Sequence, residues 1–236
     1  MKAMILAAGL GTRFKPWTDR HPKALALVNG KSLLQRNIIY LQTFGIRDVL
    51  VNVHHFADQI RDAIESNQGW GSHITISDES SEVLETGGGL LKAAPHFNNG
   101  SFVLMNVDIL TDLDLSAMIS FHTEKKPLAT LAVTDRKSSR YFLFNKTGKL
   151  SGWRNIKSGE EKISIPVNDP HEKAFSGIHL ISPDIFPLIH RQGKFSIVDV
   201  YLELAPIHTI LGYDHSGSRL VDVGRPESVL IAEKLF

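Results

Sequence analysis

The amino-acid sequence predicts an α/β protein in which helices cover both faces of a mainly parallel sheet, giving three layers. Two observations lead to this prediction. Short apolar runs that are typical of buried strands alternate with segments whose apolar residues recur at helical spacing. The first half of the chain repeats this strand–helix order, which is typical of parallel strands joined by crossover helices.

The first half contains the clearer strand and helix patterns. Strands are expected at residues 2–8, 48–53, 73–77, 102–107 and 128–134. Helices are expected at residues 32–44, 56–64, 89–94 and 113–121. Phe56, Ile60 and Ile64 show the helical spacing, and Gly45 ends the first helix. Ligands of parallel sheets bind at the carboxyl ends of the strands, so we expect a site formed by the residues that follow these strands.

The second half is less regular. It predicts a hairpin from residues 141–144 and 149–153, strands at 174–181 and 219–223, and helices at 183–190, 197–204 and 226–236. Residues 158–173 are polar and aperiodic and predict a mobile loop or lid. There is no internal repeat and no linker rich in proline, glycine or serine. We therefore expect a single domain, residues 1–236, with halves at 1–135 and 136–236.

The composition excludes several classes of protein. The 236 residues carry a net charge of +1, so a nucleic-acid partner is not expected and any anion site must be local. The chain has no cysteine, which excludes disulfides, thiolate metal sites and a cysteine nucleophile. No apolar run is long enough for a membrane span, and the apolar stretch at 3–8 is too short for the core of a signal peptide. We therefore expect a cytoplasmic protein without a membrane partner.

A glycine-containing loop follows the first predicted strand. Gly9 and Gly11 let the backbone approach a ligand and aim N–H groups at an anion. A dinucleotide-binding loop requires a third glycine where this chain has Phe14, and the Gly-Lys-Ser/Thr of a P-loop is absent. From its glycines alone, the loop is either a phosphate site of another kind or a tight turn.

Three cations follow this loop in the sequence. They are Arg13, Lys15 and Lys23, and Pro16 and Pro22 stiffen the segment that carries them. A triphosphate bears several negative charges, which arginine and lysine side chains neutralise well. The combination of glycines and cations favours a triphosphate site over a solvated basic loop.

Two aspartates lie where predicted strands end. Asp108 follows the apolar strand 102–107, and Asp222 lies in the late strand 219–223. Two carboxylates beside a triphosphate suit Mg²⁺, which takes few protein ligands and several phosphate oxygens. Each aspartate could instead be a helix N-cap or a loop acid. The residues alone do not favour Asp222 over Asp199 or Asp214.

Three consecutive glycines at residues 87–89 lie between a predicted strand and a predicted helix. Each would weaken a helix start by about 1 kcal/mol relative to alanine, so a packing or binding reason is expected. We interpret them as letting the backbone come close to a nucleobase and ribose. The alternative is a flexible loop.

The segment LAAGLGTRFKPWTDRHPKAL, which contains the loop and its cations, resembles the signature of the sugar-nucleotidyltransferase family. The resemblance covers nearly the whole chain, and the closest likeness is to short bacterial uridylyltransferases acting on N-acetylmuramate 1-phosphate. Further matching pieces are residues 84–89, 106–108, 175–178 and 221–224. Where family members have Gly-Asp before the metal site, this chain has Val107-Asp108, which leaves the carboxylate in place. The resemblance implies a Rossmann-like fold of the nucleotide-diphospho-sugar transferase type, with residues 1–135 as the nucleotide-binding half and 136–236 as the sugar-binding and lid half.

The resemblance also implies roles for individual residues. The nucleotide would be bound by Ala8, Gly9, Gly11, Thr12, Arg13, Lys23, Glu85, Gly87 and Gly88. The catalytic residues would be Arg13, Lys23 and Asp108. The sugar phosphate would be bound by Asn106, Gly152, Glu172 and Gly177, although for Glu172 a salt bridge within the lid is an equal alternative. The metal, Mg²⁺ or alternatively Mn²⁺, would be bound by Asp108 and Asp222.

The implied reaction is metal-dependent transfer of a nucleotidyl group from a nucleoside triphosphate to a sugar 1-phosphate, with release of pyrophosphate. The resemblance favours UTP and N-acetylmuramate 1-phosphate, in peptidoglycan recycling. Catalysis of an in-line attack on the α-phosphorus needs positioning and charge neutralisation. The alternatives are mannose-1-phosphate guanylyltransferase or glucose-1-phosphate thymidylyltransferase, cytidylyl transfer to an alcohol phosphate, and a regulatory nucleotide-binding module. A monomer is favoured over a dimer.

Overall fold

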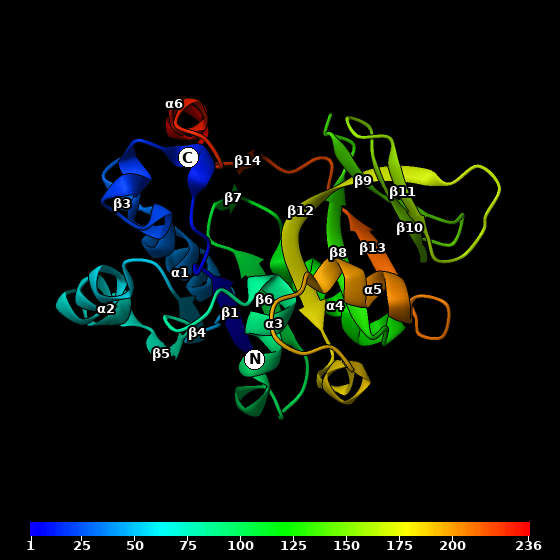
Figure 1. Ribbon diagram of the computed structural model, residues 1–236, viewed down its shortest axis with the longest axis horizontal. Coiled ribbons are helices and arrows are strands. Elements are labelled where there is room, and N and C mark those ends of the chain that lie inside the picture. The colour runs from blue at the N-terminus through cyan, green and yellow to red at the C-terminus, as the bar shows by residue number, and fades with distance from the viewer.

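A ten-stranded mixed sheet runs through the protein, which the computed structural model describes over residues 1–236 (Figure 1). Its strands are β1 (Lys2–Leu6), β4 (Asp48–Val53), β5 (His73–Asp78), β6 (Phe102–Asn106), β8 (Ala129–Thr134), β9 (Arg140–Phe144), β10 (Leu150–Asn155), β11 (Glu160–Ile163), β12 (His171–Ile181) and β13 (Ile210–Asp214). They follow the order β11-β10-β9-β12-β6-β1-β4-β5, and β8 pairs with β12 and β13. Two small sheets pair β2 (Leu27–Val28) with β3 (Lys31–Ser32) and β7 (Ile109–Thr111) with β14 (Leu220–Asp222).

The first half of the chain supplies a parallel block of strands. β6, β1, β4 and β5 run side by side in one direction, so their carboxyl ends lie at the same edge. β12 runs antiparallel to β6, β8 and β9 and connects this block to the second half. The block is the parallel sheet that the alternation of strands and helices predicts.

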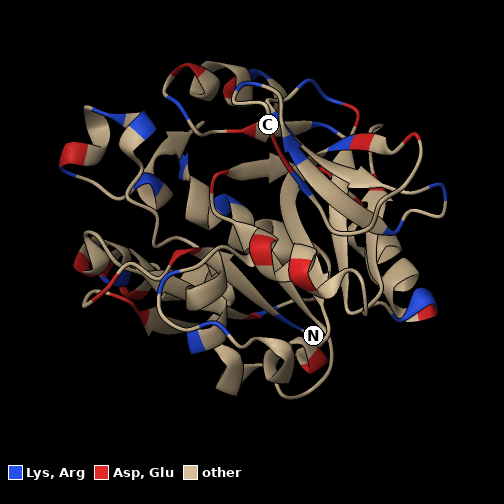
Figure 2. Ribbon diagram, turned by 45° about the vertical axis from the view of Figure 1, so that its right-hand side comes forward, with Lys and Arg blue, Asp and Glu red and all other residues tan.

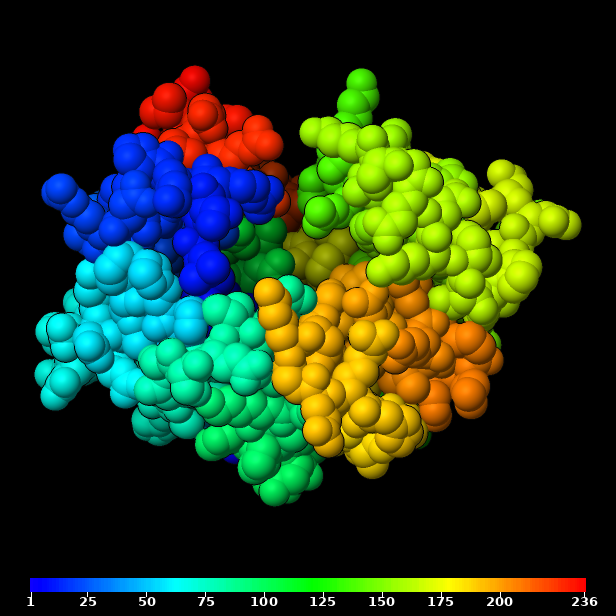
Figure 3. Space-filling view, viewed as in Figure 1, coloured from blue at the N-terminus to red at the C-terminus, as the bar shows by residue number.

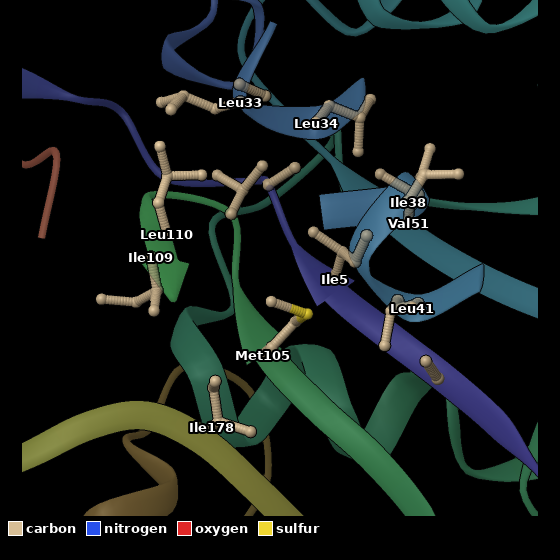
Figure 4. Packing of buried hydrophobic residues seen from close by; sticks show 14 of the residues in the cluster. Ile5, Leu33, Leu34, Ile38, Leu41, Val51, Met105, Ile109, Leu110 and Ile178 are labelled. Atoms are coloured by element: carbon tan, nitrogen blue, oxygen red, sulfur yellow. The ribbon is translucent and has the colours of Figure 1, made fainter. Parts of the chain in front are cut away.

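Helices pack on both faces of the sheet. They are α1 (Leu33–Thr43), α2 (Ala57–Ser66), α3 (Glu85–Lys92), α4 (Leu115–Lys125), α5 (Ile197–Leu204) and α6 (Glu227–Leu235). Successive residues of a strand face opposite sides, and Ile5 of β1 belongs to a buried cluster with α1, whereas Met4 belongs to a second cluster with α3 and α5. Figure 4 shows Ile5 and Met105 beside Ile38 and Leu41 of α1. The predicted three-layer α/β fold is confirmed.

Capping side chains define where two of the helices begin. The Ser32 hydroxyl accepts a hydrogen bond from the Gln35 amide at 3.1 Å, and the Asp114 carboxylate accepts one from the Ala117 amide at 3.1 Å. These contacts satisfy amides that have no partner within the helix, and α1 and α4 therefore begin directly after the capping residues.

Charged residues of both signs are interspersed over the ribbon (Figure 2), in keeping with the net charge of +1. Mixed charge of this kind leaves anion binding to local groups of cations. None of the helices combines the length and the apolar character that a membrane crossing requires.

The segment predicted as a loop or lid, residues 158–173, contains strands instead. β11 pairs antiparallel with β10, with Gly152 opposite Ile163 and Asn155 opposite Glu160, and β12 begins at His171. All four residues of β11 are exposed, so the strand lacks the apolar alternation by which a half-buried strand is recognised. The prediction of a loop was wrong at residues 160–163 and 171–173, because backbone pairing rather than burial holds these strand residues, whereas residues 164–170 lie outside helices and strands as predicted.

Two smaller differences concern β13 and α3. The sequence analysis missed β13, whose residues Ile210–Asp214 pair in parallel with β8. α3 begins at Glu85 rather than at Gly89, so the three consecutive glycines lie within the helix. Their neighbours, described below, explain why a helix retains residues of such low helix propensity.

Candidate active site

Two cavities at the carboxyl edge of the parallel block join into one cleft. The first has a volume of about 500 Å³ and is lined by the loop after β1 and by the ends of β4 and β6. The second has a volume of about 800 Å³ and is lined mainly by β9, β10 and the residues around them. Asn106 and Ser196 line both cavities. Figure 3 shows the hollow between the blue N-terminal segment, the orange segment that includes α5, and the yellow-green strands of the second half.

Asn52 holds the start of the loop after β1. Its side-chain oxygen accepts hydrogen bonds from the amides of Ala7 and Ala8 at 2.7 and 3.3 Å. The amides of Gly9 and Leu10, which follow in the cavity lining, donate to no other group of the protein. The loop therefore offers free backbone donors to an anion.

Gly11 has a conformation and surroundings that exclude a side chain. Its φ is +61°, and a Cβ atom would lie 2.8 Å from the Cγ2 atom of Thr18 and 3.3 Å from the Cβ atom of Lys23. The Thr18 hydroxyl donates to the Gly11 carbonyl oxygen at 2.9 Å. The turn at Gly11 thus packs the glycine loop directly against the segment that carries Lys23.

Lys23 and Asp108 form an ion pair at the centre of the cleft. Their side chains are only 15% and 13% exposed, and both residues line the first cavity. A cation and a carboxylate that are both predicted to act on phosphates therefore neutralise each other here. Such a pair is held more strongly than one on the open surface, because water screens it less.

Asp222 is brought beside Asp108 by pairing of the two small strands. β14 pairs antiparallel with β7, with Asp222 opposite Ile109, and the Val223 amide donates to the Asp108 carbonyl oxygen at 2.8 Å. Desolvation in the cleft and then the negative charge of Asp108 raise the pKa of Asp222. The two predicted metal ligands therefore lie close enough to affect each other's charge.

Arg13 reaches the same point of the cleft from the opposite side. A Cβ atom on Gly224 would lie 2.7 Å from Oδ1 of Asp222 and 3.1 Å from Nη2 of Arg13, so both side chains lie against this glycine. Arg13 lines the second cavity, as Asp222 does. The structure thus brings Arg13, Lys23 and both aspartates together at the junction of the two cavities.

The consecutive glycines of α3 serve close packing. A Cβ atom would lie 2.4 Å from the Phe195 ring at Gly87, 2.2 Å from the Gly193 carbonyl oxygen at Gly88, and 2.6 Å from Oε1 of Glu79 at Gly89. The amides of Gly87 and Gly88 donate to the Phe195 carbonyl oxygen at 2.9 and 3.3 Å. The glycines therefore let the segment before α5 lie directly on α3.

Only some of the α3 residues that are predicted to bind the nucleotide line the first cavity. Glu85 lines the first cavity, and so does Thr86, whose hydroxyl accepts a hydrogen bond from the Ile197 amide at 3.0 Å. Gly87 and Gly88 are buried and lie outside the lining of the cavity. Nucleotide contact by these two glycines stays a prediction.

The residues predicted for the sugar phosphate fall into two groups. Gly177 has a φ of +73°, and a Cβ atom there would lie 2.9 Å from Nδ2 of Asn106; both residues line the second cavity. Gly152 lies beneath β11, where a Cβ atom would be 2.8 Å from the Lys162 carbonyl oxygen, and Glu172 forms an ion pair with Arg154. Neither Gly152 nor Glu172 lines the cavity, because strand pairing and the ion pair engage them elsewhere.

Residues of the cleft that the sequence analysis missed include Asn52, Glu79 and Arg136. Asn52 is a buried polar residue near the end of β4, and Glu79 directly follows β5, so the rule of strand ends could have found both. Asn52 donates to Oε1 of Glu79 at 2.8 Å, and burial raises the pKa of this carboxyl group. Arg136 lines the second cavity and lies in a polar loop that gives no comparable signal.

Comparison with known proteins agrees with this geometry. A family model described as nucleotidyl transferase matches residues 2–234. The chain belongs to this nucleotidyl transferase family. The predicted membership of the sugar-1-phosphate nucleotidyltransferases is therefore confirmed, as is the prediction that the protein is an enzyme.

Individual members of the nucleotidyl transferase family match along nearly their full length. The N-acetylmuramate alpha-1-phosphate uridylyltransferase of Neisseria meningitidis serogroup B is 30% identical over 224 residues, which cover 95% of this chain and 93% of that protein. The protein of the same name from Caulobacter vibrioides is 29% identical over 242 residues, covering 98% and 95%. The solved structure of the inositol-1-phosphate CTP transferase from T. maritima has a TM-score of 0.78 at 15% identity and covers 99% of this chain and 95% of that one, which supports the fold.

Proposed function

We propose that this nucleotidyltransferase transfers the uridylyl group of UTP to N-acetylmuramate 1-phosphate and releases pyrophosphate, as a step of peptidoglycan recycling. The observation that carries the proposal is the cleft itself. Free amides of the glycine loop, two cations and two carboxylates converge where a nucleotide-sized cavity meets a second cavity. The choice of UTP and this sugar rests on the relative from Neisseria meningitidis and its coverage of both chains.

The two cavities would each hold one of the two substrates. The first contains the glycine loop with its free amides, so it would hold the triphosphate, with the base between that loop and α3. The second contains Asn106, Gly177 and Trp153, whose polar groups and aromatic ring suit a sugar. The reacting phosphates would then meet at the junction, beside Asp108 and Asp222.

The donor set at the junction fits Mg²⁺, and Mn²⁺ as an alternative. Asp108 and Asp222 supply two carboxylates, and no group of three or more histidine, aspartate and glutamate side chains is arranged for a metal ion. Mg²⁺ bound with a nucleotide takes one or two carboxylates and completes its shell with phosphate oxygens and water. When bound there, it would neutralise charge that develops on the phosphates.

Lys23 and Arg13 supply the positive charge that the chain itself contributes. The triphosphate would compete with Asp108 for Lys23. The Lys23 ammonium group would then pair with the phosphates and leave the Asp108 carboxylate free. Arg13, opposite Asp222, would neutralise the departing pyrophosphate. No general base is required, because a sugar phosphate is largely ionised at neutral pH.

A panel of nucleoside triphosphates and sugar 1-phosphates, followed by pyrophosphate release, tests the proposal. We expect the highest kcat/KM with UTP and N-acetylmuramate 1-phosphate. A higher value with GTP and mannose 1-phosphate, or with a cytidylyl or thymidylyl donor, would overturn the substrate assignment. Asp108→Asn should abolish nearly all turnover while the circular dichroism spectrum stays that of the parent, and full activity of this variant with Mg²⁺ would refute the role of the carboxylate.

A further inference from the structure

We propose that Arg140, with Lys157 beside it, binds a carboxylate on the sugar, whereas Arg136 binds the sugar's 1-phosphate. The inference rests on the proposed function and names the substrate class of the same site. It assigns the second cavity to sugar 1-phosphates that carry an acidic substituent. It also assigns specificity to residues other than those of the glycine loop and the two aspartates.

The charges that line the second cavity do not balance. The cations are Arg13, Arg136, Arg140, Lys157 and Lys162, and the carboxylates are Glu160, Asp199 and Asp222. Lys162 engages Asp199 at 2.9 Å and Glu160 at 3.7 Å, and Asp222 lies with Arg13 against Gly224. Arg136, Arg140 and Lys157 have no carboxylate partner within 4.0 Å. Three cations of one cavity therefore lack a carboxylate partner, whereas a single phosphate carries a charge of only about −1.5 to −2.

Arg136 is placed for the phosphate. Its Nη2 atom donates to the Phe175 carbonyl oxygen at 2.8 Å, while its buried Nε atom has no hydrogen-bond partner. Phe175 lies two residues before Gly177, which packs against Asn106 where the two cavities meet. Arg136 is thus fixed at the end of the cavity where nucleotidyl transfer takes place.

Arg140 and Lys157 line the cavity where β9 begins and just after β10 ends. Arg140 is directly opposite Asn155 in the β9–β10 pair, and the Ile156 amide donates to the Ser139 carbonyl oxygen at 2.9 Å. The Ser138 amide donates to the Tyr141 hydroxyl at 2.7 Å and braces the loop that precedes Arg140. Strand pairing and this brace therefore hold the backbone of the two cations in place.

The position of Arg140 and Lys157 determines the class of ligand. They line the same cavity as Arg136, so one molecule that bears its phosphate at Arg136 would present a second anion to them. A carboxylate suits this place, because the planar guanidinium of arginine binds it with two parallel hydrogen bonds. Neutral sugar phosphates would leave both cations unpaired.

The test compares two substrates that differ only in the acidic group. N-acetylmuramate 1-phosphate and N-acetylglucosamine 1-phosphate are assayed with UTP, and the binding of each is measured by calorimetry without nucleotide. We expect Arg140→Gln to lower kcat/KM and affinity for the acidic sugar by about tenfold or more, as loss of a charge-assisted hydrogen bond does, and to leave the neutral sugar within about twofold. Lys157→Gln should act in the same direction, and Arg136→Gln should lower kcat/KM and affinity for both sugars.

Lys137→Gln provides the matched control, since Lys137 is an exposed cation of the same loop that does not line the cavity. This variant should keep the kcat/KM and the affinity of the parent for both sugars. Equal losses for both sugars in Arg140→Gln, or a parent enzyme that binds the neutral sugar as tightly as the acidic one, would overturn the inference. If UTP supports no turnover, the proposed function fails, and the calorimetric comparison still decides whether Arg140 selects the acidic sugar.

Discussion

The amide of Val223 donates a 2.8 Å hydrogen bond to the carbonyl oxygen of Asp108. This bond extends the pairing of β14 with β7 and holds Asp222 beside Asp108. Two acids that are far apart in the sequence thus become neighbours through backbone geometry. Both side chains line the cleft, where the Asp108 carboxylate pairs with Lys23.

Replacing Asp222 by asparagine removes one of these two charges without changing the size of the side chain. We expect kcat to fall by at least about a hundredfold, because charge neutralisation at the phosphates is the main source of catalysis. Mn²⁺ binding in the presence of UTP, followed by electron paramagnetic resonance, should weaken in parallel. Asp169→Asn, at an exposed position outside both cavities, is the control and should behave as the parent. Unchanged Mn²⁺ binding by Asp222→Asn would refute the metal assignment.

Much of the fold could be predicted from local patterns. β4 and α5 have the predicted bounds because each is an apolar pattern contained within one element. β11 could not be predicted, since its stability comes from pairing with β10 and its residues are exposed. The apolar pattern of a segment shows which of its faces is buried, but it does not show with which strand the segment pairs.

Some residues of the site could likewise be predicted from the sequence, and others could not. The glycine loop and Lys23 lie close in sequence, and their convergence could be predicted from spacing. Asn52 could have been found from its place near the end of β4, whereas the role of Arg136 depends on which loops meet across the cleft, so no spacing reveals it. The packing role of the α3 glycines could not be predicted either, because their neighbours in the segment 193–197 are remote in sequence.

Gly88→Ala should destabilise the protein. Its Cβ atom would lie 2.2 Å from the Gly193 carbonyl oxygen, a backbone atom that moves only with its whole segment. We expect a loss of about 1–3 kcal/mol in the free energy of unfolding, measured by urea denaturation. Gly217→Ala is the matched control, because nothing lies within 4 Å of a Cβ atom there and its φ is not left-handed. A Gly88→Ala variant as stable as the Gly217→Ala variant would contradict the packing role.

Asn52→Ala tests the support of the glycine loop. The substitution removes the acceptor of the Ala7 and Ala8 amides and the donor to buried Glu79. We expect a loss of about 1–3 kcal/mol in stability and a KM for the triphosphate raised several-fold, since the buried groups lose their partners and the loop loosens. Asn67→Ala, whose side chain bonds only within its own helix, should cost less than about 1 kcal/mol and leave KM unchanged. An unaltered KM in Asn52→Ala would show that the loop does not need this support.

Buried His179 should make stability depend on pH. Burial lowers its pKa to about 3, whereas in the unfolded chain it is about 6.5. Between these values the unfolded state binds the proton and the folded state does not, so stability is lost as the pH falls from about 6.5 toward 3, by up to about 1.4 kcal/mol per pH unit.

His179→Gln removes this titration and keeps a polar partner for the Tyr201 hydroxyl, which lies 2.8 Å from Nδ1 of the histidine. The slope of the free energy of unfolding against pH, measured between pH 4 and 6, should decrease by up to about 1.4 kcal/mol per pH unit, which corresponds to one proton. His96→Gln, at an exposed position, serves as the control for the substitution itself. An identical slope in the parent and in His179→Gln would rule out this source of acid sensitivity.

The pairing of β14 with β7 has a consequence for how the enzyme folds. Thr111 and Arg219, which hydrogen-bond across this pair, are 108 positions apart in the chain. Contacts of such long range close late, because the loop entropy must be overcome before the contact stabilises anything. The pairs β1–β4 and β4–β5 span only 46 and 25 positions, from Lys2 to Asp48 and from Asp48 to His73, and can therefore form first. We expect catalytic competence to appear after most of the secondary structure during refolding.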